Sequence, residues 1–134
     1  MDTEQTQLTS GPLVYYAEDD PVMARMFERV FRLNGCRVVL ASDGDEAVQK
    51  LESLEERPSV IVLDVMMPKK SGFEALSEIK AHSRYCDVPV VMLTNLSEQK
   101  DLDKAEALGA NGYIVKSALP PNEIVTQIIE RITM

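Results

Sequence analysis

The sequence is poor in the residue types that most often bind transition metals or form nucleophilic catalytic sites. Its single histidine, His82, cannot support a zinc site or a Ser-His arrangement, and we expect it on the surface of a helix. The two cysteines, Cys36 and Cys86, lie far apart and lack the paired spacing of a metal site. We therefore expect two reduced thiols in a cytoplasmic protein.

Basic residues and long apolar runs are also scarce. The 134 residues include 14 Lys and Arg against 22 Asp and Glu, a formal net charge of -8. This balance argues against a nucleic-acid partner, because such surfaces need clustered basic side chains to displace counterions. No apolar run approaches the roughly 20 residues of a membrane span, and the polar, acidic start lacks the features of a signal peptide. The length is that of one ordinary domain.

Apolar patterns of two kinds alternate along the chain. Residues 1–12 are mostly polar and predict a disordered leader, and residues 13–134 are expected to form the domain. Within it, short β-branched runs predict five strands, each followed by apolar residues at helical spacing. The expected strands cover residues 13–17, 37–41, 60–63, 88–93 and 111–115. This alternation favours an α/β fold, with a parallel sheet covered by helices on both faces.

Capping residues and glycines indicate where the helices begin and end. Asp20 and Pro21 are suited to open the first helix, and Asn34-Gly35 to close it. Ser42-Asp43-Gly44 is expected to cap the second helix, and the third helix is expected to end near Arg84. Ser97 is the expected cap of the fourth helix and Gly109 its end, and Pro120 is expected to open the last helix.

Polar side chains stand where four of the predicted strands end. Asp64 follows the buried run 60–63 directly, and taken alone it could equally leave the sheet into solvent or cap a turn. Parallel strands, however, bring their carboxyl ends to one edge, where such folds bind ligands. The residues that meet there are Glu18, Asp19, Asp64, Thr94 and Lys116.

Three carboxylates so close together repel, and the pKa of at least one rises unless a cation intervenes. Lys116 supplies one positive charge, and Mg2+, which prefers carboxylates, a carbonyl and waters, is suited to supply the rest. Such a site can receive a phosphoryl group on an exposed carboxylate, with metal and ammonium offsetting the charge on the transferred oxygens. Asp64 is the expected nucleophile, and the Thr94 hydroxyl is placed to donate to a phosphoryl oxygen.

Four segments carry a resemblance to a known family. They are residues 14–21, residues 63–68 with Ser71-Gly72, residues 91–94 and residues 112–116. From about Leu13 to Ile132 the sequence resembles the receiver domain of two-component response regulators, here of a stand-alone type. The resemblance implies a flavodoxin-like, doubly wound (βα)5 three-layer sandwich with a five-stranded parallel sheet of order 2-1-3-4-5.

The resemblance also implies a role for each site residue. Asp64 would accept the phosphoryl group from a phosphohistidine on a sensor histidine kinase or a histidine phosphotransfer protein. Asp19, Asp64 and the main-chain carbonyl of Met66 would bind Mg2+ directly, with Glu18 acting mostly through water. Lys116 would pair first with Asp64 and then with the phosphoryl group.

The family also implies a conformational switch. Thr94 would move toward the phosphate and Tyr113 would turn inward behind it. The surface remodelled would be the fourth helix, the fifth strand and the last helix, for a downstream protein partner. Phosphorylation-dependent homodimerisation through the last helix is a family habit that the sequence leaves open.

Three residues depart from the family pattern. Ser117 follows Lys116 where the family usually has a cis proline, and because a non-proline cis bond costs about 2.5–4 kcal/mol a trans bond is favoured. Asn95 follows Thr94 where a small residue is commoner. Met66, two residues after Asp64, cannot position an attacking water, so we expect slow intrinsic dephosphorylation.

Two other functions stay open from the sequence. A haloacid-dehalogenase-like phosphohydrolase also uses an aspartyl nucleophile, but it needs a second acid two residues later, where this chain has Met66. A receiver-like interaction domain that is never phosphorylated is the other alternative. Against it, all the acidic, hydroxyl and basic positions carry chemically competent residues, and we expect a phosphoacceptor module rather than an enzyme.

Overall fold

Strands and helices alternate from one end of the described chain to the other. The structure is a computed structural model that describes residues 10–132. Within that range the elements are β1 (Leu13–Ala17), α1 (Pro21–Leu33), β2 (Arg37–Ala41), α2 (Gly44–Glu52), β3 (Val60–Leu63), α3 (Gly72–Ala81), β4 (Val90–Thr94), α4 (Gln99–Ala107), β5 (Gly112–Val115) and α5 (Pro121–Ile132). Of these helices, none has the length and apolar character needed to cross a membrane.

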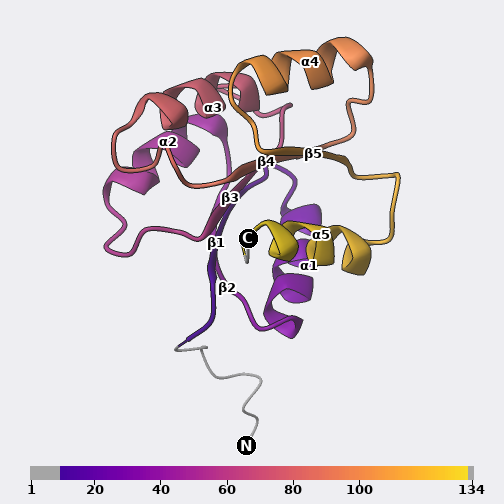
Figure 1. Cartoon of the computed structure of the whole chain (residues 1–134). Helices are drawn as coiled ribbons and strands as arrows, with labels where there is room; N and C mark the ends of the chain where they lie inside the picture. The colour runs from indigo at the N-terminus through magenta and orange to yellow at the C-terminus, as the bar shows by residue number, and fades with distance from the viewer. Residues whose placement is uncertain (1–9, 133–134) are drawn as a thin grey trace, which may run out of the picture.

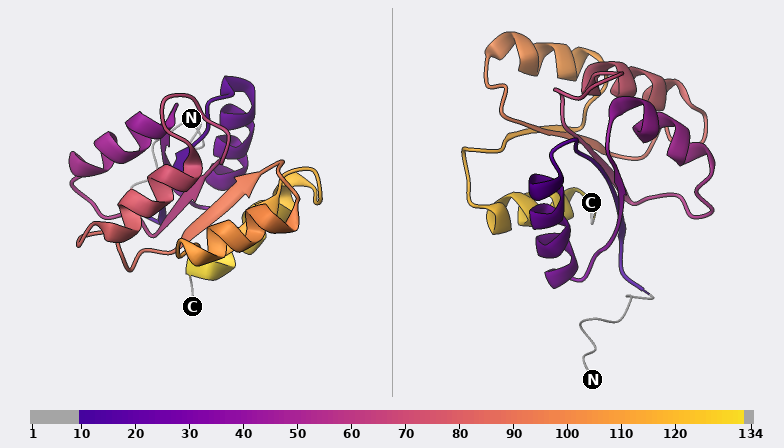
Figure 2. Two further views of the ribbon diagram at one scale, coloured as in Figure 1. Left: turned by 90° about the horizontal axis from the view of Figure 1, so that it is seen from above. Right: turned by 180° about the vertical axis from the view of Figure 1, so that it is seen from behind.

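The strands form one sheet in the order β2-β1-β3-β4-β5, and every neighbouring pair is parallel. Figure 1 shows α1 and α5 together on one face and α2, α3 and α4 on the other. The two further views in Figure 2 agree with this division. The doubly wound three-layer sandwich and its strand order are therefore confirmed.

Each face of the sheet has its own hydrophobic core, because successive side chains of a strand point to opposite faces. In β1, Tyr15 and Ala17 belong to the core beneath α2, α3 and α4. Val14 and Tyr16 belong to the core beneath α1 and α5. All five residues of β1 and all four of β3 are buried, which explains the continuous apolar runs in the sequence.

Side-chain caps begin three of the helices. Asp20 accepts hydrogen bonds from the backbone N–H groups of Val22 and Met23 at the start of α1, and Asp43 accepts one from Glu46 in α2. Ser71 and Glu74 form a reciprocal capping box in α3. The predicted caps of the first two helices are confirmed. These helices begin just beyond β1, β2 and β3, so their caps also fix the loops at the carboxyl edge of the sheet.

Several predicted boundaries were wrong by one to three residues. Strand β4 begins at Val90 rather than at residue 88, since Pro89 has no N–H to contribute to the ladder. The cap of α4 is Glu98 rather than Ser97, and it makes no side-chain hydrogen bond. Helix α3 ends at Ala81, well before Arg84, while β5 and α5 each begin one residue later than predicted.

The predicted disordered leader lies mostly outside the described residues, of which only 10–12 belong to it. These are attached to the neighbouring strand: the Arg37 guanidinium donates to the Gly11 carbonyl at 3.0 and 2.9 Å. The Arg37 backbone N–H donates to the Pro12 carbonyl at 2.8 Å. Gly11 and Pro12, the last residues before β1, are therefore held against Arg37 of β2.

We expect Gly72→Ala to destabilise the domain by at least about 3 kcal/mol, the upper end of overpacking costs. An added Cβ would lie 2.0 Å from the Asp64 carbonyl oxygen, a backbone atom that cannot turn aside. Gly35→Ala is the control, since its Cβ meets nothing within 4 Å and its φ of +86° adds only about 1–2 kcal/mol of left-handed strain. Urea unfolding compares the two, and an equal cost would contradict the close approach at Gly72.

Candidate functional site

The carboxyl ends of β1 and β3 bring three acidic side chains together. One carboxylate oxygen from each of Glu18, Asp19 and Asp64 lies within 4.8 Å of the other two. Glu18 is only 3% exposed and Asp64 only 6%, whereas Asp19 faces solvent. Two of the three carboxylates are thus removed from water, at a cost that calls for a nearby cation.

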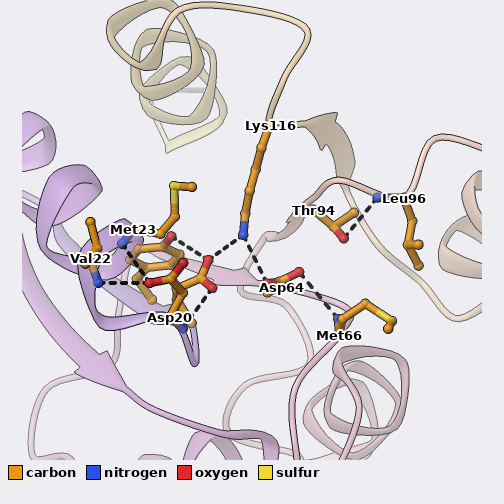
Figure 3. Close-up of polar contacts among 10 residues, drawn as sticks. Asp20, Val22, Met23, Asp64, Met66, Thr94, Leu96 and Lys116 are labelled. Carbon is orange, nitrogen blue, oxygen red and sulfur yellow. Dashed lines mark hydrogen bonds and ion pairs between the residues drawn. The ribbon is translucent and has the colours of Figure 1, made fainter.

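Lys116, at the end of β5, supplies that cation. Its Nζ lies 2.5 Å from Glu18 Oε1 and 3.0 Å from Asp64 Oδ2, and its side chain is only 8% exposed. Figure 3 shows the ammonium pointing from above toward the Asp64 carboxylate. One ammonium therefore joins two buried carboxylates, and the four side chains together keep an excess of negative charge.

Burial, hydrogen bonds and neighbouring charges together shift the pKa values of Glu18 and Lys116. Burial raises the pKa of the Glu18 carboxyl, and the hydrogen bond from Lys116 opposes this without cancelling it. Burial lowers the pKa of Lys116, but the hydrogen bond to Glu18 and the charge of Asp64 outweigh it and leave that pKa raised. Both directions indicate a site that favours additional positive charge.

Glu18 has further donors that the sequence did not indicate. The Tyr16 hydroxyl donates to Glu18 Oε1 at 3.1 Å, and the Asp20 backbone N–H donates to Oε2 at 3.2 Å. From its sequence context, Tyr16 is expected only as part of an apolar strand. A signal existed nevertheless, because a buried tyrosine needs a hydroxyl partner, and residues i and i+2 of a strand share one face.

The second oxygen of Asp64 faces the loop after β3. The Met66 backbone N–H lies 3.4 Å from Asp64 Oδ1 (Figure 3), and the Met66 side chain is 65% exposed. Met66 and Asp19 line an open cleft beside this carboxylate, together with Leu96 and Lys104. The cleft is lined by residues that directly follow Asp64 in the chain, while Asp64 itself is almost fully buried.

Contacts with α2 and α3 hold the loop after β3 in place. Lys69 has a φ of 71°, the only positive value among the non-glycine residues of the described chain, and its ammonium lies 3.6 Å from Asp43. Lys70 pairs with Glu78 at 2.5 Å, and the Gly44 N–H donates to the Pro68 carbonyl at 3.4 Å. The loop beside the acidic pocket is therefore attached at several points.

Thr94 and Tyr113 are both connected to Leu96. The Leu96 backbone N–H donates to Thr94 Oγ1 at 3.3 Å, a contact drawn in Figure 3. The Tyr113 hydroxyl donates to the Leu96 carbonyl at 2.8 Å. Thr94 is fully buried and Tyr113 half-buried. The two residues predicted to act as a switch thus meet through one loop residue.

The residues around Lys116 hold it firmly despite Ser117. No peptide bond within residues 10–132 is cis, so the Lys116–Ser117 bond is trans as the sequence favours. The Lys116 backbone N–H donates to the Thr94 carbonyl at 2.8 Å. Lys116 therefore reaches Asp64 without the proline that the family usually carries.

Residues 14–129 match the family described as Response regulator receiver domain. The chain belongs to this family. It is 36% identical over 115 residues to the phosphate regulon transcriptional regulatory protein PhoB of Escherichia coli (strain K12), covering 86% of this chain and 49% of PhoB. It is equally identical over 115 residues to the probable transcriptional regulator ycf27 of Guillardia theta, covering 86% of this chain and 43% of that protein. The receiver thus spans less than half the length of these relatives.

Solved structures of receiver domains have the same fold over nearly the whole of this chain. The chemotaxis protein CheY4 of Vibrio cholerae has a TM-score of 0.82 at 28% identity, covering 92% of this chain and 99% of that one. The receiver domain of the sensor histidine kinase PA1611 from Pseudomonas aeruginosa PAO1, solved with a magnesium ion in its active site cleft, has a TM-score of 0.82 at 29% identity, covering 93% and 100%. The family is one of signalling modules rather than classical enzymes.

The structure brings Glu18, Asp19, Asp64 and Lys116 together, and it joins Thr94 to Tyr113 through Leu96. Their individual roles, and the carbonyl of Met66 as a metal ligand, stay predictions. Membership of the receiver family sets aside the phosphohydrolase alternative, in agreement with the apolar residue at position 66.

In metal-free protein we expect Lys116→Met to cost about 3–5 kcal/mol of unfolding free energy, because it leaves two buried carboxylates without a cation. Asp64→Asn, which removes one repelling charge and keeps the pair between Lys116 and Glu18, should fall within about 1 kcal/mol of wild type or be more stable. Urea unfolding with a chelator present measures both. If Lys116→Met leaves the free energy of unfolding unchanged, the ionic account of the site is refuted.

Proposed function

We propose that Asp64 accepts a phosphoryl group from a phosphohistidine on a sensor histidine kinase or phosphotransfer protein, in the presence of Mg2+. The observation that supports this most is the position of the Lys116 ammonium, 3.0 Å from Asp64 Oδ2, beside two further carboxylates. A carboxylate that is paired with an ammonium, and that lies beside an open cleft lined by Asp19 and Met66, is suited to act as a nucleophile toward a charged phosphoryl group.

In the transfer, a carboxylate oxygen of Asp64 attacks phosphorus while the bond from phosphorus to the histidine nitrogen breaks. The Lys116 ammonium, which has three protons, keeps one for a transferred oxygen after its bonds to Glu18 and Asp64. The Thr94 hydroxyl donates to another oxygen once it is released from Leu96. No further residue is needed as a base, because the carboxylate is already ionised.

The donor set fits Mg2+, a hard cation that prefers oxygen ligands. Asp19, Asp64 and the Met66 carbonyl would hold the ion, and Glu18 would contribute through water because its own oxygens already accept from protein donors. When bound, Mg2+ neutralises charge on the phosphoryl oxygens. Burial and the charge of Asp64 raise the pKa of the Glu18 carboxyl, a direction consistent with a pocket that favours further positive charge.

The phosphoryl group then acts through Leu96. Movement of the Thr94 hydroxyl toward the phosphate breaks its bond with the Leu96 N–H, and the Leu96 carbonyl is held by Tyr113. A change at the phosphate is thereby transmitted to the surface of α4, β5 and α5, where a downstream protein partner docks. The same surface includes α5, and homodimerisation through α5 after phosphorylation stays a prediction.

We also propose that the receiver acts on a downstream protein rather than on nucleic acid. Its curated relatives are named as transcriptional regulators, but this chain spans less than half their length. The net charge of -8 favours a protein partner over direct nucleic-acid contact by the receiver itself. Exposed, apolar Met66 next to Asp64 offers no group to orient a water, so the aspartyl phosphate should hydrolyse slowly.

We expect wild-type protein, incubated with Mg2+ and a small acyl-phosphate donor, to gain the mass of one phosphoryl group. Asp64→Asn should gain none, because its amide is not a nucleophile. Asp87→Asn is the matched control: Asp87 is an exposed acid paired with Arg57, and its variant should be phosphorylated like wild type. Intact-mass spectrometry follows both the gain and its decay after the donor is removed.

Each outcome of that experiment separates the alternatives. A phosphoprotein that persists for minutes or longer supports the proposal, and it supports slow hydrolysis due to the apolar Met66. Loss within seconds without a phosphatase would contradict slow hydrolysis, and continuous turnover of the donor would indicate a phosphohydrolase. A chain that never gains mass would be a receiver-like interaction domain.

Millimolar Mg2+ should raise the melting temperature of the unphosphorylated protein. Binding to the folded state alone stabilises it by about 2.7 kcal/mol when the free ion exceeds its Kd a hundredfold. Asp64→Asn should lose much of this gain, since it removes a ligand and relieves part of the repulsion beforehand. Differential scanning fluorimetry with and without a chelator measures the shift, and an equal response in both proteins would refute the shared metal site.

A further inference from the structure

We propose that Tyr16 is a positioning residue for phosphoryl transfer. Its hydroxyl holds the Glu18 carboxylate in place as the partner of Lys116 and keeps it from binding the metal directly. This inference rests on the proposed function and extends it to a residue in the core. It concerns a hydrogen bond from β1 that nothing in the family's motif of acidic, hydroxyl and basic residues requires.

A continuous chain of hydrogen bonds runs from Tyr16 to the phosphoacceptor. The Tyr16 hydroxyl donates to Glu18 Oε1 at 3.1 Å, and the same oxygen accepts from Lys116 Nζ at 2.5 Å. Lys116 Nζ then donates to Asp64 Oδ2 at 3.0 Å, the contact drawn in Figure 3. The position of the Tyr16 hydroxyl thus influences where the ammonium lies relative to Asp64.

The Tyr16 ring is a rigid support for this chain. It is fully buried, and α1 packs against it through Phe27 and Phe31. The ring centroids lie 6.0 Å from Phe27 at an interplanar angle of 83°, and 6.3 Å from Phe31 at 61°. Both are edge contacts of the kind that aromatic pairs prefer. The core of the α1 face therefore fixes the direction in which the hydroxyl points.

Protein donors occupy both oxygens of Glu18. Oε1 accepts from Tyr16 and Lys116, while Oε2 accepts from the Asp20 backbone N–H at 3.2 Å. Without the Tyr16 hydroxyl, Oε1 loses one of its two donors and the carboxylate gains freedom to rotate. Oxygens of Asp19 and Asp64 lie within 4.8 Å, so a released Glu18 can join them around a cation. We expect such a Glu18 to bind the metal more directly and Lys116 less firmly.

Tyr15 provides a control that matches Tyr16 in almost every respect. It is the preceding residue of the same strand, is equally buried, and donates its hydroxyl to the Ala47 carbonyl at 2.6 Å. That contact lies on the opposite face of the sheet, in the core beneath α2. Tyr15→Phe and Tyr16→Phe each remove one buried hydroxyl from β1, so any purely structural effect should appear in both.

The test measures two quantities in wild type, Tyr15→Phe and Tyr16→Phe, at a temperature where all three are folded. The first is the rate of phosphorylation by a small acyl phosphate at saturating Mg2+. We expect a fall of about tenfold in Tyr16→Phe, the low end of the range for losing a hydrogen bond that orients a ligand, and a rate near wild type in Tyr15→Phe. The second is the Mg2+ concentration at half of the melting-temperature shift, which should decrease only in Tyr16→Phe.

The route through Glu18 is tested by combining variants. In a Glu18→Gln background, Tyr16→Phe should no longer change the half-saturating Mg2+ concentration, because the carboxylate it releases is absent. Equal behaviour of Tyr15→Phe and Tyr16→Phe in both measurements would overturn the inference while leaving the proposed function intact. If wild type accepts no phosphoryl group, the proposed function fails, and the Mg2+ measurement alone still decides whether Tyr16 restrains Glu18.

Discussion

The ion pairs of Lys116 with Glu18 and Asp64 are the interaction on which the rest of this site depends. Two carboxylates leave water at the carboxyl edge of the sheet, and one ammonium offsets their charge. Because Asp19 adds a third negative charge close by, the offset is incomplete. This incomplete offset is the physical basis of the proposal that the pocket binds Mg2+ and accepts a phosphoryl group.

The parallel sheet explains how such a pocket is assembled. All of its strands end at the same edge, so residues far apart in the sequence meet there, and the capped starts of α1, α2 and α3 fix the intervening loops. The two faces then serve different parts of the site. The α1 and α5 face supports Glu18 through Tyr16, and the face beneath α2, α3 and α4 contains Tyr113 and Leu96.

The family match and the contacts of Lys116 are independent observations on the same site. The comparisons assign the chain to the receivers, and solved receivers share its fold over more than nine-tenths of its length. The pairing of Lys116 with both carboxylates is a property of this chain, as is its trans bond to Ser117. Membership of the family leaves open the rate of phosphorylation and the affinity for Mg2+, which we expect these features of Lys116 to influence.

The sequence alone determined the five strands, the acidic and basic residues at their ends, and the helix caps at Asp20 and Asp43, because periodicity and capping act over a few residues. Exact boundaries did not follow from local signals, since α4 starts at Gln99 after Glu98, a cap residue that makes no side-chain hydrogen bond. Only the tertiary structure decided that Tyr16 donates to Glu18 and that Leu96 joins Thr94 to Tyr113. A hydroxyl or a carbonyl finds its partner only after the sheet and helices have packed, so the spacing of Tyr16 and Glu18 indicates that their side chains share a face but not that they form a bond.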